Sequence, residues 1–256
     1  MKRKHGQVQL AVDTRELAEN LIDVGQEKPM SVFSDPCSSE FAYSTGNSLW
    51  GASYELIRFI QEDGDGGGPF CGQAVELGAG SGAVSLVLWM RGAAVLGTDV
   101  ELGLMQFNID HNTEYGANAG AKRGGISTAC LEWKDHNAAR TVRADVSPGL
   151  IVGAELSYDS DIHADLIETL LILTARDPKE EREEQEQEEE KEEEEPCVVL
   201  LAVPHRDEDR ELITTAKAKG FNVQLMKACP PTEEHASEVG IYKLVRRSAA
   251  KGKKTQ

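Results

Sequence analysis

Apolar residues in this chain form short runs that alternate with segments of helical spacing. The first complete unit covers residues 74–90, where an apolar run ends, a turn holds Gly78, Gly80 and Gly82, and apolar residues resume at helical spacing. This order is typical of the first strand, the phosphate-type loop and the first helix of a doubly wound sheet. Glycines free the backbone and leave the N–H groups at the helix start open to a ligand. The pattern predicts a nucleotide-like cofactor over this loop.

A second apolar run, over residues 93–99, ends in Asp99. The carboxylate stands about 20 residues after the glycines, where dinucleotide folds place an acceptor for ribose hydroxyls. Loop and carboxylate together predict an adenosine-containing cofactor. Gly78, Gly80 and Ala83 also satisfy the dinucleotide pattern, so the spacing alone leaves a nicotinamide cofactor open.

The alternation continues toward the C-terminus. Further strands are expected over residues 127–131, 150–158, 197–203, 221–226 and 240–245, and helices over residues 53–60, 101–112, 161–175 and 208–219. Five strand–helix alternations followed by two consecutive strands predict an α/β fold. We expect a Rossmann-like, doubly wound, seven-stranded sheet with helices on both faces. The sheet would be mostly parallel, and its C-terminal antiparallel hairpin would place residues 240–245 at an edge.

The first 40 residues are weakly patterned. Residues 8–12 alternate like a short strand, residues 17–22 fit either a helical turn or a strand, and residues 29–39 are interpreted as a loop. We expect three parts: a partly ordered extension over 1–40, a main domain over 41–247 with a Glu-rich insertion at 178–196, and a basic tail over 248–256.

The net charge of the chain limits the binding partners that can be expected. The chain of 256 residues has a formal net charge of −17, and residues 179–195 hold twelve glutamates against three basic residues. Because the remainder is also acidic, a nucleic acid is an unlikely main partner and a basic protein is easier to accommodate. The glutamate tract is expected to be solvated. No apolar run approaches the ~20 residues that cross a bilayer, so we expect a cytoplasmic protein without membrane contact, with the nucleus also possible.

Cysteine and histidine usage gives no metal or disulfide signal. The five cysteines are scattered, and the histidines have no metal-ligand spacing. We predict no metal, interpret the histidines as surface or capping residues, and expect buried or semi-buried thiols.

Five segments together resemble the seven-β-strand methyltransferases, in particular the family 16 group of protein-lysine methyltransferases (methyltransferase-like 21 type). They are residues 46–50 (GNSLW), 75–82 (VELGAGSG), 98–99 (TD), 131–133 (LEW) and 153–158 (GAELSY). The resemblance covers residues 41–247 and implies S-adenosylmethionine as methyl donor.

The resemblance also implies cofactor-binding residues: Trp50, Glu76, Gly78, Ala79, Gly80, Asp99, Trp133 and Ala154. In this scheme Asp99 would accept the ribose hydroxyls, and Trp133 would lie beside the adenine. Trp50, whose place at the entrance of the first expected helix by itself favours a core anchor, would close over the cofactor.

Residues 155–158 resemble the family's acidic-x-x-aromatic motif near the acceptor amine, with Glu155 where aspartate is common. Methyl transfer to an amine depends mainly on alignment of donor and acceptor. A lysine, with its free pKa of ~10.4, must also lose a proton. Glu155 and Tyr158 would guide the ammonium by charge and cation–π contact. The resemblance therefore implies a monomeric lysine methyltransferase acting on a cytosolic protein, such as a chaperone or an elongation factor.

Three alternatives stay open. One is a nicotinamide-dependent oxidoreductase, although the sequence contains no Tyr-x-x-x-Lys. Another is methylation of a small molecule or a nucleic acid, although residues 155–158 lack the prolines of the aminated-base enzymes. The last is a non-catalytic binding protein that keeps the fold.

Overall fold

The computed structural model describes residues 17–24, 29–35, 48–62, 72–118, 124–175, 195–206, 209–233 and 235–247. Outside the described residues lie the strand predicted at 8–12, residues 178–194 of the Glu-rich insertion, and the basic tail. The division into an extension, a main domain and a tail therefore stays a prediction.

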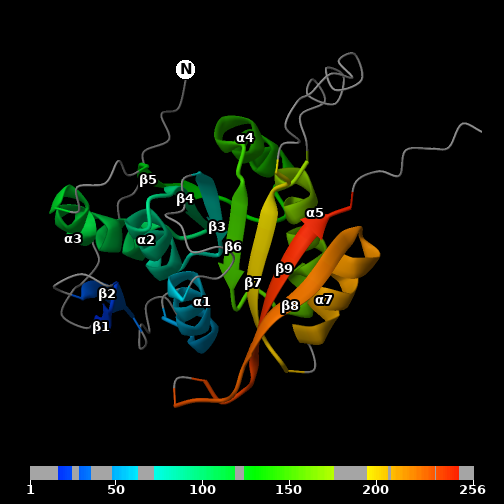
Figure 1. Cartoon of the computed structure of the whole chain (residues 1–256). Helices are drawn as coiled ribbons and strands as arrows, with labels where there is room; N and C mark the ends of the chain where they lie inside the picture. The colour runs from blue at the N-terminus through cyan, green and yellow to red at the C-terminus, as the bar shows by residue number, and fades with distance from the viewer. Residues whose placement is uncertain are drawn as a thin grey trace, which may run out of the picture.

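A seven-stranded sheet forms the centre of the molecule (Figure 1). Its strands are β3 (Gln73–Leu77), β4 (Ala94–Asp99), β5 (Ile126–Cys130), β6 (Leu150–Ala154), β7 (Val198–Pro204), β8 (Phe221–Cys229) and β9 (Val239–Arg246). Their order is β5-β4-β3-β6-β7-β9-β8. The strands from β5 to β7 pair in parallel, whereas β9 is antiparallel to both β7 and β8. This confirms the predicted doubly wound α/β sheet with a C-terminal hairpin.

The predicted edge strand is wrong. β9 lies between β7 and β8, so β8 forms the edge. β9 buries Ile241 and Leu244 completely, whereas β8 carries exposed Asn222 and Gln224 along its length. The more apolar strand gains most from an inner position, and a polar strand tolerates an edge.

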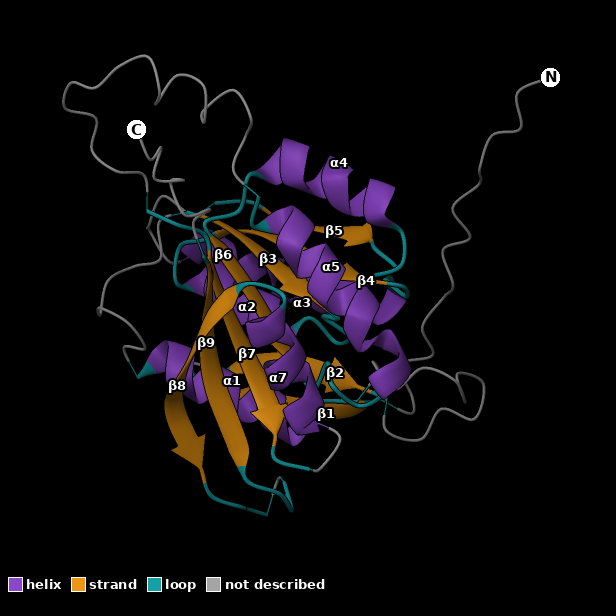
Figure 2. Cartoon of the chain, turned by 90° about the vertical axis from the view of Figure 1, so that its right-hand side faces the viewer, coloured by secondary structure: helices purple, strands orange, loops and turns teal. Residues whose placement is uncertain are grey.

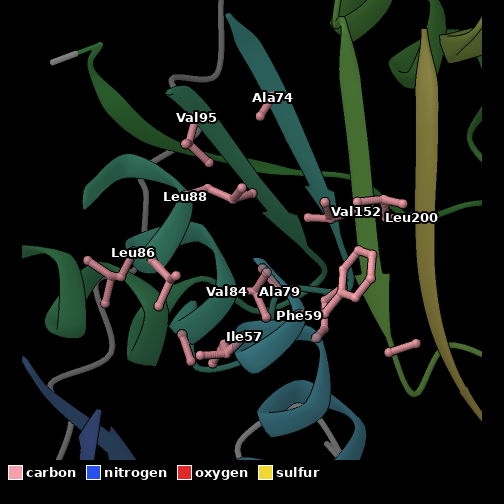
Figure 3. Close-up of a cluster of buried hydrophobic side chains, with 14 of the residues drawn as sticks. Ile57, Phe59, Ala74, Ala79, Val84, Leu86, Leu88, Val95, Val152 and Leu200 are labelled. Carbon is pink, nitrogen blue, oxygen red and sulfur yellow. The ribbon is translucent and has the colours of Figure 1, made fainter. Parts of the chain in front are cut away.

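Helices cover both faces of the sheet. On one face lie α1 (Gly51–Gln61), α2 (Ala83–Met90) and α3 (Gly103–Asn118), and on the other α4 (His136–Val146), α5 (His163–Leu173) and α7 (Asp209–Ala218). Figure 2 looks onto the face that carries α4, α5 and α7. Figure 3 shows the opposite core, where Ile57 of α1 and Val84 of α2 pack near Val152 and Leu200 of the sheet. The α4 helix was not among the predicted elements.

An N-terminal hairpin pairs β1 (Ala18–Ile22) with β2 (Met30–Ser34). Of the two alternatives for residues 17–22, the structure therefore shows the strand. The loop predicted for residues 29–39 is wrong where β2 forms, at residues 30–34. Met30 and Val32 are buried at alternate positions, as expected for a strand with one covered face. Asn108 of α3 fastens the strand, because its side chain accepts from Phe33 N and donates to Phe33 O, both at 2.8 Å.

Two histidines are buried, whereas the sequence predicted surface or capping residues. Only His163 fits the second part of that prediction, because it caps the short helix Ser160–Ile162. His163 is buried and its Nε2 lies 3.0 Å from Ser157 O. His235 is also buried, with Nε2 3.2 Å from a carboxylate oxygen of Glu55. Both rings satisfy polar groups inside the fold.

The thiols fit the prediction only in part. Cys229 is buried and Cys197 half-buried, but Cys130 is exposed because it ends β5 at the outer edge of the sheet. In the described ranges, no helix combines the length and the apolar character needed to span a bilayer.

Candidate active site

The candidate site lies where the carboxyl ends of β3, β4 and β6 meet. The chain order reverses between β3 and β6, and such a switch point leaves a crevice for ligands in doubly wound sheets. A cavity of about 390 Å³ opens there, and a smaller one of about 30 Å³ lies under the glycine loop. The ten predicted site residues all line one or both cavities: Trp50, Glu76, Gly78, Ala79, Gly80, Asp99, Trp133, Ala154, Glu155 and Tyr158.

The glycine loop turns sharply because Gly78, Gly80 and Gly82 adopt left-handed φ angles of 60°, 52° and 77°. A Cβ atom on Gly78 would lie 2.6 Å from Leu156 Cδ2 and 3.3 Å from the Trp133 ring. The missing side chain therefore lets the loop approach the Trp133 indole closely.

Asp99 joins the end of β4 to this loop. Its Oδ2 accepts from Gly80 N at 2.8 Å, and its Oδ1 accepts from Val100 N at 2.7 Å and from Glu101 N at 3.3 Å. An ionised carboxylate offers about four acceptor positions, so this fixed group can still accept a ligand hydroxyl.

Glu76 is buried under the loop and lines the smaller cavity. Its Oε2 accepts from Ser85 N at 2.7 Å and from the Ser85 hydroxyl. Burial raises the pKa of this carboxyl to about 8, although the bonds from Ser85 oppose the shift. A cationic ligand group in this cavity would favour the ionised form.

Trp50 stands immediately before α1 and lines both cavities. Its residue surface is 46% exposed, so the core-anchor interpretation is wrong. A ligand that extended from one cavity into the other would pass this residue.

The strand predicted over residues 150–158 ends earlier, at Ala154. Glu155 has a left-handed φ of 58°, which turns the chain out of the sheet, and Tyr158 follows with 51% of its surface exposed. Both side chains therefore come from the loop after β6 and reach the larger cavity.

The Glu155 carboxylate connects three elements. It accepts from the backbone N–H of Ala52 in the first turn of α1, where helix donors lack intrahelical partners. It also lies 3.0 Å from Arg206 Nη2, after β7. Burial raises the pKa of Glu155, while Arg206 and the Ala52 N–H hold the increase down.

Arg206 was missed by the sequence analysis. It lines the larger cavity, and its Nε donates to Oδ2 of buried Asp209 at 2.6 Å. Its position three residues after a predicted strand, at the ligand-binding edge, was the available signal.

The residues present fit an adenosine cofactor with a cationic end. The larger cavity falls within the ~300–1,000 Å³ typical of small-molecule sites, and it combines an indole surface with a fixed carboxylate. The second, buried carboxylate of Glu76 lies beside the glycine loop.

A family model described as lysine methyltransferase matches residues 37–193, which is more than half of the chain. Among solved structures, SMU.776 complexed with SAH aligns with a TM-score of 0.56 at 12% identity, covering 91% of this chain and 57% of that one. The N-methyltransferase NodS from Bradyrhizobium japonicum WM9, in complex with S-adenosyl-L-homocysteine, gives 0.52 at 11% identity, with coverages of 80% and 94%.

The tRNA (uracil-54, C5)-methyltransferase from Pyrococcus abyssi, also in complex with S-adenosyl-L-homocysteine, gives a TM-score of 0.51 at 14% identity. The alignment covers 90% of this chain, and the chain spans 45% of the tRNA enzyme's length. At such identities the likeness concerns the fold.

The match to the lysine methyltransferase model, together with the fold shared with SAH-bound structures, places the chain in the class of S-adenosylmethionine-dependent methyltransferases. S-adenosylmethionine is the cofactor of this class. Within it, the chain belongs to the lysine methyltransferase family.

Proposed function

We propose that the protein transfers a methyl group from S-adenosylmethionine to the ε-amine of a lysine in a protein substrate. The observation that carries the proposal is a single cavity lined both by Asp99 and Trp133 and by Glu155 and Tyr158. Membership of the lysine methyltransferase family supports the choice of acceptor.

On the cofactor side, Asp99 accepts the ribose hydroxyls and Trp133 packs beside the adenine. The methionine and ribose portion lies along Gly78, Ala79, Gly80 and Ala154. Glu76 faces the ammonium group of the cofactor, and Trp50 covers the cofactor. When bound, the cofactor supplies a methyl group on a sulfonium, which is a good leaving group. The chain's contribution is to hold that group in line with the acceptor.

On the acceptor side, Tyr158 and Glu155 line the same cavity, where Tyr158 is half-exposed and the Glu155 side chain is mostly buried. The carboxylate attracts the lysine ammonium, and the phenol ring contacts it by a cation–π interaction. Removal from water then lowers the pKa of the amine, which favours loss of its proton to solvent before transfer.

The net charge of the chain and its family support a proposal for the class of protein substrate. A net charge of −17 favours a partner with a basic surface around the target lysine. The proposal includes a cytosolic protein, such as a chaperone or an elongation factor, and a monomeric enzyme built on residues 41–247.

The test is incubation with S-adenosylmethionine carrying a radioactive methyl group and a cell lysate, followed by hydrolysis of the labelled protein. We expect label in methyl-lysine, and large losses for Asp99→Ala and Glu155→Ala. The control Asp145→Ala removes an exposed carboxylate of α4 outside both cavities and leaves transfer unchanged. Label only in RNA or small metabolites would refute the lysine proposal. Unchanged transfer in both site variants would refute the residue assignment.

A further inference from the structure

Arg206 brings a fixed cation into the place where the proposed reaction admits a lysine. Its Nη2 lies 3.0 Å from Glu155 Oε2, and both side chains line the larger cavity with Tyr158. The arginine side chain is 48% exposed, whereas that of Glu155 is 15% exposed. The guanidinium therefore stands on the open side of the carboxylate.

Asp209 holds Arg206 in this position. The side chain of Asp209 is 1% exposed, and it accepts from Arg206 Nε at 2.6 Å, from Arg206 Nη2 at 3.4 Å and from Arg206 N at 3.3 Å. The Ser157 hydroxyl, from the same loop as Glu155, donates to this carboxylate too. Because a planar guanidinium bonded at two nitrogens loses little further freedom, Arg206 is preorganised toward Glu155.

The charges of these three residues leave room for one more cation. Two carboxylates and one guanidinium carry a net charge of −1, which a lysine ammonium would neutralise. Without Arg206, the ammonium would meet two carboxylates, and nearby opposite charge raises the pKa of an amine. The remaining charged groups lining the cavity are Asp99, Glu132, Lys134 and Asp165, of which Lys134 and Glu132 form an ion pair.

We propose that Arg206 is a positioning residue that shares the Glu155 carboxylate with the substrate's lysine. A carboxylate that also bonds Arg206 still attracts the lysine ammonium, but it raises the pKa of the amine less than an unshared carboxylate would. The proposal rests on the proposed function, and it adds the residue that controls the charge of the acceptor.

The ammonium releases a proton to solvent water, and the nitrogen lone pair forms the new N–C bond. The C–S bond breaks, its electron pair stays on sulfur as a neutral thioether, and the product is an N-methylammonium. A second positive charge near the nitrogen favours the first of these events, because it destabilises the protonated amine.

Binding of n-butylammonium, which has the four-carbon chain of lysine, tests the proposal without any methyl transfer. Calorimetry at neutral pH, with and without S-adenosylhomocysteine, compares the wild type with Arg206→Gln. We expect about three- to tenfold tighter binding in the variant, equivalent to a pKa change of up to about one unit. Glu155→Gln should bind n-butylammonium more weakly than the wild type. Arg206→Lys keeps the charge but not the two-nitrogen contact, so its affinity should lie between those of the wild type and Arg206→Gln.

Arg210→Gln is the matched control, because Arg210 is an exposed cation in the first turn of α7 and lies outside both cavities. Thermal unfolding shows whether each variant is folded. If Arg206→Gln does not fold, Arg206→Lys decides the proposal: tighter n-butylammonium binding than in the wild type supports it, and equal or weaker binding overturns it.

Kinetics on a pool of peptides with one lysine each give a second readout. For Arg206→Gln we expect a lower kcat together with a lower KM, and a half-maximal kcat at a pH up to about one unit higher. Weaker or unchanged n-butylammonium binding, or an equal loss of kcat at every pH, would overturn the proposal. If the wild type methylates no lysine but Arg206→Gln binds the amine more tightly, the proposed function fails and the shared carboxylate stands.

Discussion

Glu76 offers the sharpest link between burial and pH. Its carboxyl is 3% exposed on β3, and burial raises its pKa from 4.5 to about 8. The folded protein therefore binds this proton more tightly than the unfolded chain does. Between pH about 4.5 and about 8 the contribution of Glu76 to the unfolding free energy decreases as pH rises, and above about 8 it stays constant.

The magnitude follows from the shift of about 3.5 units. At 1.36 kcal/mol per unit, ionising Glu76 costs the folded state at most about 5 kcal/mol. Glu76→Gln removes this titration and keeps an oxygen that accepts from Ser85. The variant should therefore be more stable than the wild type above pH about 8, by up to this amount, and no more stable below pH about 5.

Urea unfolding of both proteins at intervals from pH about 5 to about 9 measures the effect. Other groups titrate in both proteins, so the difference between the two curves isolates Glu76. We expect this difference to grow with pH and to level off above about 8. Parallel curves would refute the reasoning, because they would show that the group has the same pKa in both states.

The same residue makes cofactor binding depend on pH. If Glu76 faces the cofactor's ammonium group, binding requires the ionised carboxylate. The affinity of the wild type for S-adenosylhomocysteine should then increase toward pH about 8 more than that of Glu76→Gln. The comparison removes the titration of the ligand's own amine, whose free pKa is also near 8. Equal pH dependence in the two proteins would exclude the contact.

Two further substitutions test the loop and the N-terminal hairpin. Gly78→Ala places a Cβ atom 2.6 Å from Leu156 Cδ2, at a left-handed φ, and displaces the Trp133 ring. Calorimetry should therefore show about tenfold weaker binding of S-adenosylhomocysteine. Unchanged affinity would contradict the close packing. Asn108→Ala removes three side-chain hydrogen bonds, two to β2 and one to the glycine loop, so the unfolding free energy in urea should fall by about 3 kcal/mol. The matched control Asn222→Ala, at an exposed position of β8, should change it by less than about 0.5 kcal/mol, and equal effects would contradict the clamp.

The sequence predicted the sheet and the meeting of the glycine loop with Asp99, because both follow from local order along the chain. The other cavity residues, such as Trp133 and Tyr158, were taken from the resemblance to the family. Glycines directly after β3 and a carboxylate at the end of β4 must meet once the two strands are parallel neighbours. Asp99 accepting from Gly80 N is the direct result.

Other features depend on packing between distant segments. The alternation of Met30 and Val32 is too short to identify a strand until α3 presents Asn108 to it. The inner position of β9 is decided by competition with β8 for a place beside β7, and a hairpin pattern allows either order.

Arg206 and α4 were missed for different reasons. The α4 helix buries only Ala139 and Val142, and its low apolar content hid the helix even though these residues stand at helical spacing and Asp135 caps the N-terminus. Arg206 lies just beyond the end of β7, as Asp99 lies at the end of β4, but its role appears only when its contacts with Glu155 and Asp209 are known.

Calorimetric titration with S-adenosylhomocysteine tests most directly that the site holds the methyl donor. The account predicts saturable binding to the wild type, weakened about ten- to hundredfold in Asp99→Ala through loss of charge-assisted hydrogen bonds. Absence of binding to S-adenosylhomocysteine, together with clear binding of a reduced nicotinamide dinucleotide, would contradict it.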